Sequence, residues 1–360
     1  MSGVRPTINI VFLYTELAGY VLTCLEALGT KDNIRLTVVH WPVKSEAPFE
    51  LPVAAPFDLV SRSNMSREDI ASHVAEIAPD GIFVSGWMDE DYLAIARTYV
   101  SQIPVVLTMD NKWTGSFKQR IVALSSPWFI QRHFNVAWVP GEEQKKYARK
   151  MGFEDSDIFA GFYSADTHRF NEIHTKKKGS KNINKKLLYI GRYVDQKGLG
   201  LLWEAFLSLH QKNPLWELHC VGTGEKFDAR LKHDKVFHHG FLQPAELEPL
   251  ILDATAFVIP SLFEPWGVVL HEMAAAGLPL ITSDAVGAAT TFVSEGVNGW
   301  SYASTDKAGL VHSIKRLYAL SDEDVFQMGE ESHRLSQCIS PDIWAGIAEN
   351  IVVLNQLSSK

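Results

Sequence analysis

The sequence predicts an α/β protein built of two Rossmann-like, doubly wound domains, each with a parallel sheet covered by helices on both faces. Three observations lead to this fold class. The chain of 360 residues is too long for one typical domain and suits two. Its short strand-like runs are almost wholly apolar, as parallel strands buried on both faces must be. Amphipathic helical stretches alternate with these runs, which indicates βαβ units.

The first half of the chain carries five such runs. We expect strands at 8–14, 34–41, 81–85, 104–109 and 136–139, and helices at 17–28, 67–77, 92–100 and 142–151.

A polar stretch over 162–186 then interrupts the alternation. It contains the basic run Lys176-Lys177-Lys178, which is typical of a solvated loop in a linker between domains. The alternative is that the basic run contacts anionic lipid.

The alternation restarts after this stretch. Its elements are strands at 186–190, 216–221, 236–239, 256–259 and 278–283, and helices at 198–211, 244–252, 268–276 and 307–317.

The last amphipathic stretch, 341–357, is expected to pack back onto the first domain. We therefore expect an N-terminal domain of residues 1–162 with 341–360, and a C-terminal domain of residues 163–340. The two domains would face a central cleft at the carboxyl ends of both sheets, where ligands of such folds bind.

Composition excludes some classes of function. The formal charge of 34 − 42 = −8 disfavours a nucleic-acid groove. The three cysteines show no zinc spacing and no disulfide framework, which fits a reducing cytoplasm. No run approaches the roughly 20 apolar residues that cross a bilayer, and residues 1–10 lack the features of a signal peptide. We expect a cytoplasmic protein that is soluble or peripheral on the inner face of a membrane.

The most informative segment runs from 261 to 272. Glu264 lies in the loop after the predicted strand 256–259, and Gly267 opens a helix. The free amides at the start of that helix form an anion site, contributed by Gly267, Val268 and Val269. Glu272 follows Gly267 by roughly 7.5 Å along the helix. Carboxylates at both positions could accept hydrogen bonds from sugar hydroxyls, whereas either one alone could be an ordinary surface charge.

A second loop joins the predicted strand 186–190 to the next helix. Gly191 ends the strand and Gly198 begins the helix, so Arg192 and Lys197 place two cations in one short loop. The arginine offers a planar fork for phosphate oxygens and the lysine a compact charge. A diphosphate between this loop and the helix after Gly267 would be neutralised from two sides without a metal.

Two further loops at the same edge give weaker indications. Gly222 and Gly224 end the strand 216–221 and allow backbone to approach a ligand. Phe241 and Leu242 follow the next strand and could offer an apolar face to a nucleobase.

These residues resemble those of the retaining GT-B glycosyltransferases of family 4. Gly191-Arg192 with Lys197-Gly198 resembles the diphosphate loop of that family, and Glu264 with Glu272 resembles its E-x7-E motif. The resemblance is specific over about 186–302 and looser over the first half. The flanking segments that match in the same way are 263–267, 276–280 and 296–299, with 164–170 resembling the inter-domain linker.

The resemblance implies roles for these residues. Arg192 and Lys197 would hold the donor diphosphate, and Glu272 the ribose. Glu264, with the amides after Trp266, would hold the transferred sugar. The family cleaves the sugar–phosphate bond with retention through a short-lived ion pair, and the leaving phosphate takes the acceptor proton. Stabilising that diphosphate supplies the electrostatic catalysis, with neither a metal nor another cofactor.

Two departures from the family pattern stand out. Asp110 occupies the place where many members carry a histidine; it could bind a sugar hydroxyl, orient the acceptor, or only cap the following helix. The usual Gly-Gly and a downstream glutamate are replaced by Gly287-Ala288-Ala289 and Thr291.

The first domain offers weaker candidates. Glu16 and Gly19 follow the opening strand, where the family has a glycine-rich loop that faces the donor. Asp89-Glu90-Asp91 matches a D-x-D metal motif, but the acidic start of a helix is the preferred interpretation. Four residues fall near the expected acceptor side: Trp87, Trp113, Lys118 and Arg120.

We therefore expect a hexosyl- or other glycosyltransferase, with a role in polysaccharide biosynthesis. It would move sugar from a nucleoside-diphosphate-sugar to a hydroxyl of a glycan, a lipid-linked or a small-molecule acceptor. The alternatives are a sugar-nucleotide epimerase or a phosphorylase of the same fold, and a nucleotide-sugar-binding protein without turnover. A dehydrogenase is disfavoured because no G-x-G-x-x-G follows the first strand.

Overall fold

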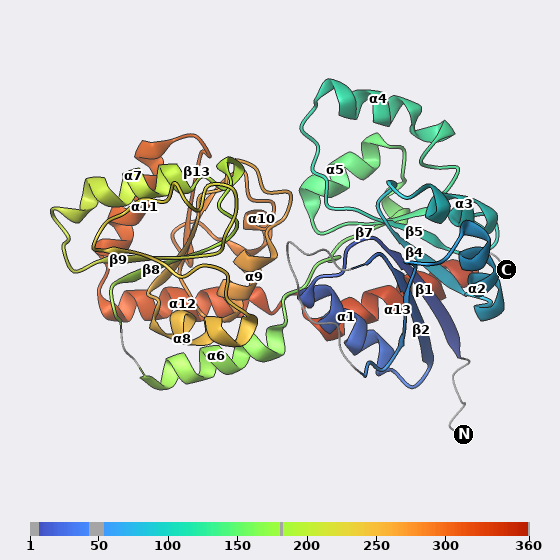
Figure 1. Ribbon diagram of the computed structural model, residues 1–360, viewed down its shortest axis with the longest axis horizontal. Coiled ribbons are helices and arrows are strands. Elements are labelled where there is room, and N and C mark those ends of the chain that lie inside the picture. Colours follow the sequence, from blue (N-terminus) through green and yellow to red (C-terminus); the bar gives the residue numbers. More distant parts are fainter. Residues whose placement is uncertain (1–6, 43–53, 181–182, 359–360) are drawn as a thin grey trace. The chain divides into compact units, whose positions relative to one another are not determined.

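The computed structural model describes residues 7–42, 54–180 and 183–358 (Figure 1). The chain divides into two compact units, one formed by Met1–Ser164 with Ile339–Lys360 and the other by Ala165–Cys338. The expected boundaries, at 162/163 and 340/341, lie close to these.

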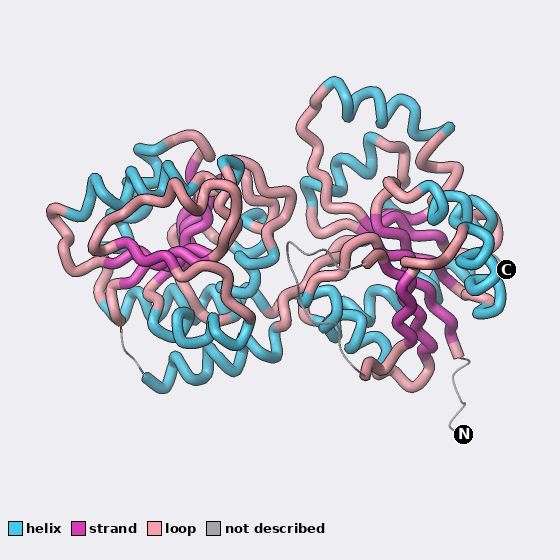
Figure 2. The backbone as a smooth tube through the Cα atoms, in the orientation of Figure 1, coloured by secondary structure: helices cyan, strands magenta, loops and turns pink. Residues whose placement is uncertain are grey.

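The first unit contains a parallel sheet with the strand order β3-β2-β1-β4-β5-β6-β7. The central strand β1 is fully paired, because Ile10 lies opposite Leu36 on one side and Gly81 on the other. Helices flank this sheet, as Figure 2 shows by colour. The strands are β1 (Ile8–Tyr14), β2 (Ile34–His40), β3 (Asp58–Ser61), β4 (Gly81–Ser85), β5 (Val105–Thr108), β6 (Val136–Trp138) and β7 (Ile158–Phe159).

The α-helices of this unit include α4, which the alternation did not predict, and α13, which matches the predicted amphipathic stretch 341–357. They are α1 (Gly19–Gly29), α2 (Arg67–Ile77), α3 (Glu90–Tyr99), α4 (Phe117–Ser125), α5 (Glu142–Lys150) and α13 (Pro341–Ser358).

The C-terminal helix α13 packs inside the first unit, against α1 and the aromatic core. The ring of Trp344 lies 4.7 Å from that of Trp138 and 5.8 Å from that of Phe12. Its Nε1–H donates to the carbonyl of Phe162 over 2.5 Å. A buried indole whose polar atom is paired stabilises the contact without an unsatisfied donor.

The second unit contains a parallel sheet with the order β10-β9-β8-β11-β12-β13, so the expected fold class of two parallel-sheet, Rossmann-like domains is confirmed. Its strands are β8 (Lys186–Ile190), β9 (Glu217–Val221), β10 (Val236–His238), β11 (Ala256–Ile259), β12 (Leu280–Ser283) and β13 (Gly299–Tyr302). Its α-helices are α6 (Thr167–Ser180), α7 (Leu199–His210), α8 (Pro244–Asp253), α9 (Val268–Ala275), α10 (Ala289–Phe292), α11 (Lys307–Tyr318) and α12 (Asp322–Ser336).

The prediction of a solvated loop over 162–186 is wrong for most of that stretch, because residues 167–180 form α6. Residues 181–182 lie outside the described residues. The basic run contacts the unit itself: Lys176 pairs with Glu248 at 2.6 Å and Lys178 with Glu330 at 2.7 Å. Lys177 donates to the carbonyls at the end of α8, and burial lowers the pKa of this lysine to about 8. These contacts favour a structural role for the run over lipid binding.

In the described part of the chain, no helix combines the length and apolar character needed to cross a membrane. The prediction about a signal peptide concerns residues 1–10, and residues 1–6 lie outside the described ranges.

Candidate functional site

The loop after β8 is held against the loop after β9 by backbone hydrogen bonds. Gly191 N–H donates to the carbonyl of Val221 over 3.0 Å, and Tyr193 N–H to that of Thr223 over 2.8 Å. Tyr193 itself is buried, whereas Arg192 is exposed. The loop therefore has a fixed backbone from which the guanidinium of Arg192 reaches solvent.

The same loop is also joined to the segment after β11. Leu262 N–H donates to the carbonyl of Gln196 over 2.8 Å, and Gln196 Nε2 donates to the carbonyl of Phe263 over 2.9 Å. Gly198, with φ +67°, allows the closest approach, since a Cβ there would lie 2.0 Å from the carbonyl oxygen of Pro260. Only glycine fits this contact without moving the backbone.

These contacts bring Lys197 and Glu264 together, 67 residues apart in sequence. The two side chains form an ion pair and are only 16% and 12% exposed. Ser261 Oγ donates to the same carboxylate oxygen over 3.4 Å. The structure thus places Lys197, expected to bind the donor diphosphate, against Glu264, expected to bind the transferred sugar.

The start of α9 lies beside this pair. Gly267, the N-cap of α9, has φ +93°, and a Cβ there would lie 2.9 Å from Glu264 Cγ. Glu264 N–H donates to the carbonyl of Ala285 over 3.3 Å, and Gly287 N–H to that of Glu264 over 3.1 Å. The amides of the first turn, including those of Val268 and Val269, therefore begin next to the Glu264 carboxylate, and the positive end of the helix dipole favours an anion there.

Trp266 contributes its backbone rather than its ring to this corner. The ring is 3% exposed and packs edge-on against Phe292, with 6.1 Å between centroids. Its carbonyl accepts from Ala288 N–H over 2.9 Å. Gly287 and Ala288, which depart from the family pattern, thus hold the loop of Glu264 and Trp266.

Glu272 lies further along α9 and has an unusual environment. Burial raises the pKa of its carboxyl to about 7, with smaller opposing effects of Arg169, which lowers it, and Asp166, which raises it. Asp166 and Arg169 lie at the start of α6, where Asp166 Oδ1 accepts from Arg169 N–H over 3.2 Å. The segment that resembles the family linker therefore borders the carboxylate that the resemblance assigns to the ribose.

His271 is a structural residue that the sequence did not single out. It is fully buried, and its ring stacks on Phe292 with 4.1 Å between centroids. Nδ1 accepts from Ala165 N–H over 3.0 Å and Nε2–H donates to the carbonyl of Ser336 over 2.8 Å. Burial lowers the pKa of His271 to about 4, so the neutral imidazole ties α9 to both ends of the second unit.

The remaining second-unit candidates also follow strands at this edge. Gly222 N–H donates to the carbonyl of Gly240 over 2.7 Å, and Gly224 packs closely on Tyr193. Phe241 is 52% exposed and Leu242 is half-buried. A pocket of about 460 Å³ opens at the same carboxyl edge, between the loops after β8, β9, β11 and β13, and is lined among others by Tyr193, Gly198, Leu199, Lys226, Leu262 and Thr305.

In the first unit, Asp110 lies after β5, at the carboxyl edge of that sheet. The interpretation of Asp110 as the cap of the next helix is wrong, because α4 begins at Phe117 and Ser116 Oγ caps it by accepting from Gln119 N–H. Burial raises the pKa of Tyr14, and Tyr20 and Asp110 add to the effect. Asp110 therefore lies near the tyrosine that ends β1.

The other first-unit candidates are spread over several elements. Glu16 is exposed, and Gly19 is the first residue of α1. Trp87 and Trp113 pack partly against the core, and the Trp113 ring lies 5.5 Å from that of Tyr147. Lys118 and Arg120 are exposed on α4.

The D-x-D match is a helix start. Asp89 caps α3 by accepting from Asp91 N–H over 2.9 Å and from Tyr92 N–H over 3.0 Å. Asp89 also pairs with Arg62, and Asp91 pairs with Arg62 and Arg67 at 2.7 and 2.8 Å. Carboxylates already committed to arginines and amides are poor metal ligands, so these contacts support the preferred interpretation.

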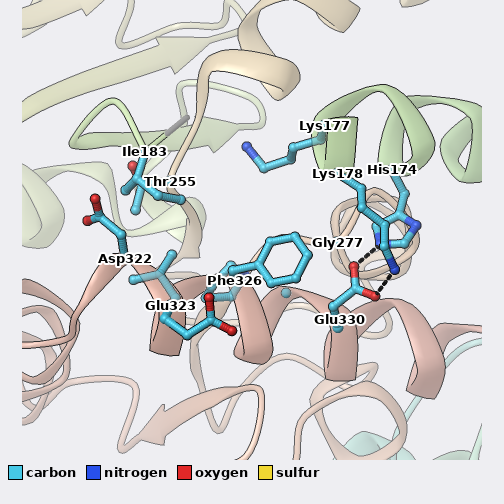
Figure 3. A pocket seen from close by; sticks show the side chains of 13 residues that line it. His174, Lys177, Lys178, Ile183, Thr255, Gly277, Asp322, Glu323, Phe326 and Glu330 are labelled. Atoms are coloured by element: carbon cyan, nitrogen blue, oxygen red, sulfur yellow. Dashed lines mark hydrogen bonds and ion pairs between the residues drawn. The ribbon is translucent and has the colours of Figure 1, made fainter. Parts of the chain in front are cut away.

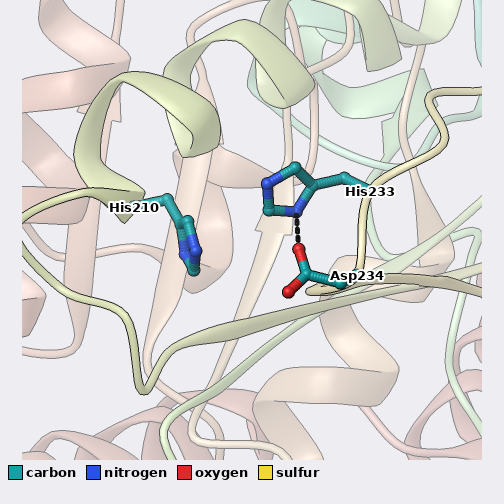
Figure 4. Close-up of side chains that lie close together, drawn as sticks. All are labelled: His210, His233 and Asp234. Carbon is teal, nitrogen blue, oxygen red and sulfur yellow. Dashed lines mark ion pairs between the residues drawn. The ribbon is translucent and has the colours of Figure 1, made fainter.

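A different trio meets the distance requirement for a metal. Within the described ranges, it is the only group of three His, Cys, Asp or Glu side chains that does: His210, His233 and Asp234, whose ligand atoms lie within 4.8 Å of one another (Figure 4). His233 Nδ1 already accepts from Lys235 N–H over 3.1 Å, and Asp234 is 80% exposed. His210 is the last residue of α7, and His233 and Asp234 lie just before β10, so the trio is at the amino edge of the sheet and outside the site.

A groove of about 240 Å³ lies at that amino edge too, between α6 and α12 (Figure 3). Lys177 and Phe326 line it, and Glu330 pairs across one end with His174 and Lys178, each at 2.7 Å. Thr255 and Pro279, which precede β11 and β12, close its floor. It belongs to the packing of α6 rather than to the carboxyl-edge loops.

Comparisons with known proteins found a family model, curated relatives and solved structures that resemble this chain. The family described as glycosyl transferases group 1 matches residues 170–336, which lie inside the second unit. Glycogen synthase from Mycobacterium tuberculosis is 35% identical over 253 residues, covering 66% of this chain and 59% of that protein.

Among solved structures, HepE from Anabaena in complex with UDP superposes with a TM-score of 0.73 at 16% identity, covering 98% of this chain and all of that one. Sucrose-phosphate synthase from Thermosynechococcus elongatus gives a TM-score of 0.70 at 17% identity over 98% and 99% of the two chains. The likeness shows the GT-B fold. The chain aligns with about three fifths of the length of the glycogen synthase that it matches.

Proposed function

We propose that this chain is a glycosyltransferase of the group 1 type, and that it moves a sugar from a nucleoside-diphosphate-sugar to an acceptor hydroxyl with retention and without a metal. The observation that carries the proposal is the corner where Lys197, Glu264 and the first turn of α9 meet, with Arg192 exposed in the same loop as Lys197. Two cations and the amino end of a helix can bind a diphosphate. The carboxylates of Glu264 and Glu272 can accept hydrogen bonds from the hydroxyls of the sugar and the ribose on either side of that diphosphate.

The proposed chemistry is electrostatic. As the sugar–phosphate bond breaks, negative charge grows on the departing diphosphate, and Lys197, Arg192 and the amides of α9 would stabilise it. Lys197 is paired with Glu264, so donor binding would draw the ammonium toward phosphate and leave the Glu264 carboxylate to accept from sugar hydroxyls. Glu272 would accept from the ribose. The leaving phosphate would take the acceptor proton, so no protein base is needed.

The donor is proposed to carry uracil in the first instance. This rests on the structures of HepE, which were solved with UDP and with UDP-glucose. The acceptor is proposed to be a hydroxyl of a glycan, a lipid-linked or a small-molecule acceptor, with a role in polysaccharide synthesis. Cytoplasmic location, with peripheral contact to a membrane, completes the proposal.

A donor screen tests the proposal. The purified protein is incubated with UDP-, GDP-, ADP- and dTDP-sugars in EDTA, and release of nucleoside diphosphate is followed. Slow release from one donor, resistant to the chelator and lost in Lys197→Ala, is expected. No release together with no thermal stabilisation by any nucleoside diphosphate would contradict the site; stabilisation without release would favour a binding protein.

A further inference from the structure

Helix α4 of the first unit turns an apolar stripe toward solvent. Phe117, Ile121, Leu124 and Trp128 recur at intervals of four, three and four, which puts them along one face of the helix and its 3₁₀ extension Ser126–Trp128. Their exposed fractions are 80%, 51%, 77% and 71%. No residue of α4 is buried, so this helix does not use its apolar face to build the core.

The exposure does not come from a loosely attached helix. On its other side, Val122 packs against the core of the unit. Ser126 Oγ donates to the carbonyl of Met151 over 2.6 Å, and Gln131 Nε2 donates to the same carbonyl over 3.0 Å. At the start of α4, Arg120 Nε donates to the carbonyl of Gly115 over 3.0 Å. The chain after the helix is therefore held to the unit through Met151, and α4 lies at the edge of the first unit (Figure 1).

The stretch of sequence that carries the stripe has charges of one sign only. Between Asp110 and Glu142 the sequence has no acidic residue, although the whole chain carries a net charge of −8. The cations of this stretch are Lys112, Lys118, Arg120 and Arg132. Lys118, Arg120 and Arg132 are exposed, and none of the three forms an ion pair within the described residues.

We propose that α4 and its extension dock the first unit onto an anionic lipid surface. Aromatic and aliphatic side chains would enter the boundary between headgroups and acyl chains, and the surrounding cations would meet lipid phosphates. Tryptophan at the end of the stripe suits that interface, because its ring is apolar and its N–H polar.

A second copy of the chain fits this surface less well. In a two-fold interface the same patch meets itself, so the cations of one copy would face those of the other with no acidic residue of the stretch between them. A lipid surface supplies the missing negative charge. The inference rests on the first unit alone and is independent of the donor site.

Vesicle co-sedimentation of the full chain tests the inference. We expect binding to phosphatidylcholine vesicles that contain phosphatidylglycerol, much weaker binding to phosphatidylcholine alone, and a decline with added salt. The double substitution Leu124→Ser with Trp128→Ser should weaken binding by at least about tenfold, because two large apolar contacts are lost. The matched control is Leu215→Ser, at an exposed position of the second unit, which should bind as the wild type does.

A second variant separates charge from apolar contact. Lys118→Gln with Arg120→Gln should lower binding to the anionic vesicles and flatten its salt dependence. Because Leu124 and Trp128 are exposed, their substitution should leave the melting temperature and the vesicle-free rate of nucleoside diphosphate release unchanged. If the wild-type protein releases none, the proposed function fails while the vesicle result still decides the inference.

Three outcomes would overturn the lipid assignment. These are equal binding of the wild type to neutral and anionic vesicles, no binding to either, and full binding by the Leu124→Ser, Trp128→Ser protein. Sedimentation velocity tests the alternative partner, a second copy of the chain. If the wild type is a dimer and the same double substitution dissociates it, the stripe is a dimer interface and the lipid assignment is wrong.

Discussion

Lys197 and Glu264 form an ion pair with each other, although the proposed chemistry assigns them to different parts of the donor. Each balances the charge of the other in a corner where both are mostly buried, which lowers the cost of holding charged groups there. The types and spacing of these residues were readable from the sequence. Their contact was not, because it depends on the approach of two loops that follow different strands. The burial that raises the pKa of Glu272 to about 7 was equally hidden.

Substitution of Lys197 should be the most damaging single change in the site. Lys197→Ala removes a cation from the departing diphosphate and leaves Glu264 without its partner. We expect kcat/KM for the donor to fall by about 100-fold or more, the scale of other electrostatic catalytic groups. The control is Lys212→Ala at an exposed position, and an unchanged rate in Lys197→Ala would assign the lysine to packing alone.

The ionisation of Glu272 should make nucleotide binding pH-dependent. A carboxylate accepts hydroxyl hydrogen bonds better than a carboxylic acid, so affinity should rise with pH through about 7, by about fivefold. The terminal phosphate of the nucleotide also titrates near this range. At each pH, the calorimetric affinity of the wild type is therefore divided by that of Glu272→Gln. The titrations run from roughly pH 5.5 to roughly pH 8.5, on both sides of the pKa of Glu272. A ratio that stays flat over this range would contradict the binding of the ribose by Glu272.

The same carboxyl should affect folding in the opposite direction. Its pKa lies above the ordinary 4.5, so the protonated form stabilises the fold below that value, and this stabilisation is lost as pH rises to about 7. Between these limits, the melting temperature should fall more in the wild type than in Glu272→Gln. Parallel thermal scans at several pH values measure the difference; identical slopes would mean that Glu272 titrates normally.

At the scale of elements, the site consists of loops that are joined to one another by hydrogen bonds. The segment 192–198 bonds to the segments that follow β9 and β11, and the start of α9 is fixed by residues 285–288. Alternating apolar runs predicted most of these elements. The sequence did not predict α6 or α4, because polar and basic residues dominate the exposed surface of α6 and α4 exposes apolar residues. Helix α4 lacks the apolar-in, polar-out pattern on which such predictions depend, and the buried face of α6 carries only two large apolar residues, Phe170 and Ile173.

A pair of neighbouring glycines tests this mutual support. In Gly198→Ala the new Cβ would lie 2.0 Å from the carbonyl oxygen of Pro260 at a φ of +67°, so the loop must shift. We expect a loss of about 1–3 kcal/mol in the free energy of unfolding and weaker nucleotide binding. Gly200, in the first turn of α7, has open space, and Gly200→Ala should be neutral or slightly stabilising. Equal effects of the two changes, in denaturant unfolding and calorimetry, would contradict the argument.

At the scale of the whole molecule, the chain returns to its first unit after completing the second. The amphipathic character of 341–357 led to the expectation that this stretch packs on the first domain. The depth of the contact could not be read, since it depends on Phe12, Trp138 and Phe162 converging on Trp344. The C-terminal helix α13 thereby completes the hydrophobic core of the first unit.

Removal of that indole should destabilise the first unit selectively. Trp344→Ala leaves a large cavity and is expected to cost about 3–5 kcal/mol, whereas Ile343→Ala, at an exposed neighbour, should cost under about 0.5 kcal/mol. Hydrogen exchange should show lost protection over 7–164 and 339–358, with residues 183–338 unchanged. Loss confined to the second unit would contradict the division of the chain.

The central claim is that the loop of Arg192 and Lys197, with the start of α9, binds a nucleoside diphosphate without a metal. Calorimetric titration of the protein with UDP, GDP, ADP and dTDP in EDTA tests it most directly, with Lys197→Ala and Lys212→Ala alongside. We expect saturable binding of one nucleotide by the wild type and by Lys212→Ala. Lys197→Ala should weaken the affinity for that nucleotide by at least about tenfold. Binding that appears only with added divalent metal, or that survives Lys197→Ala unchanged, would contradict it.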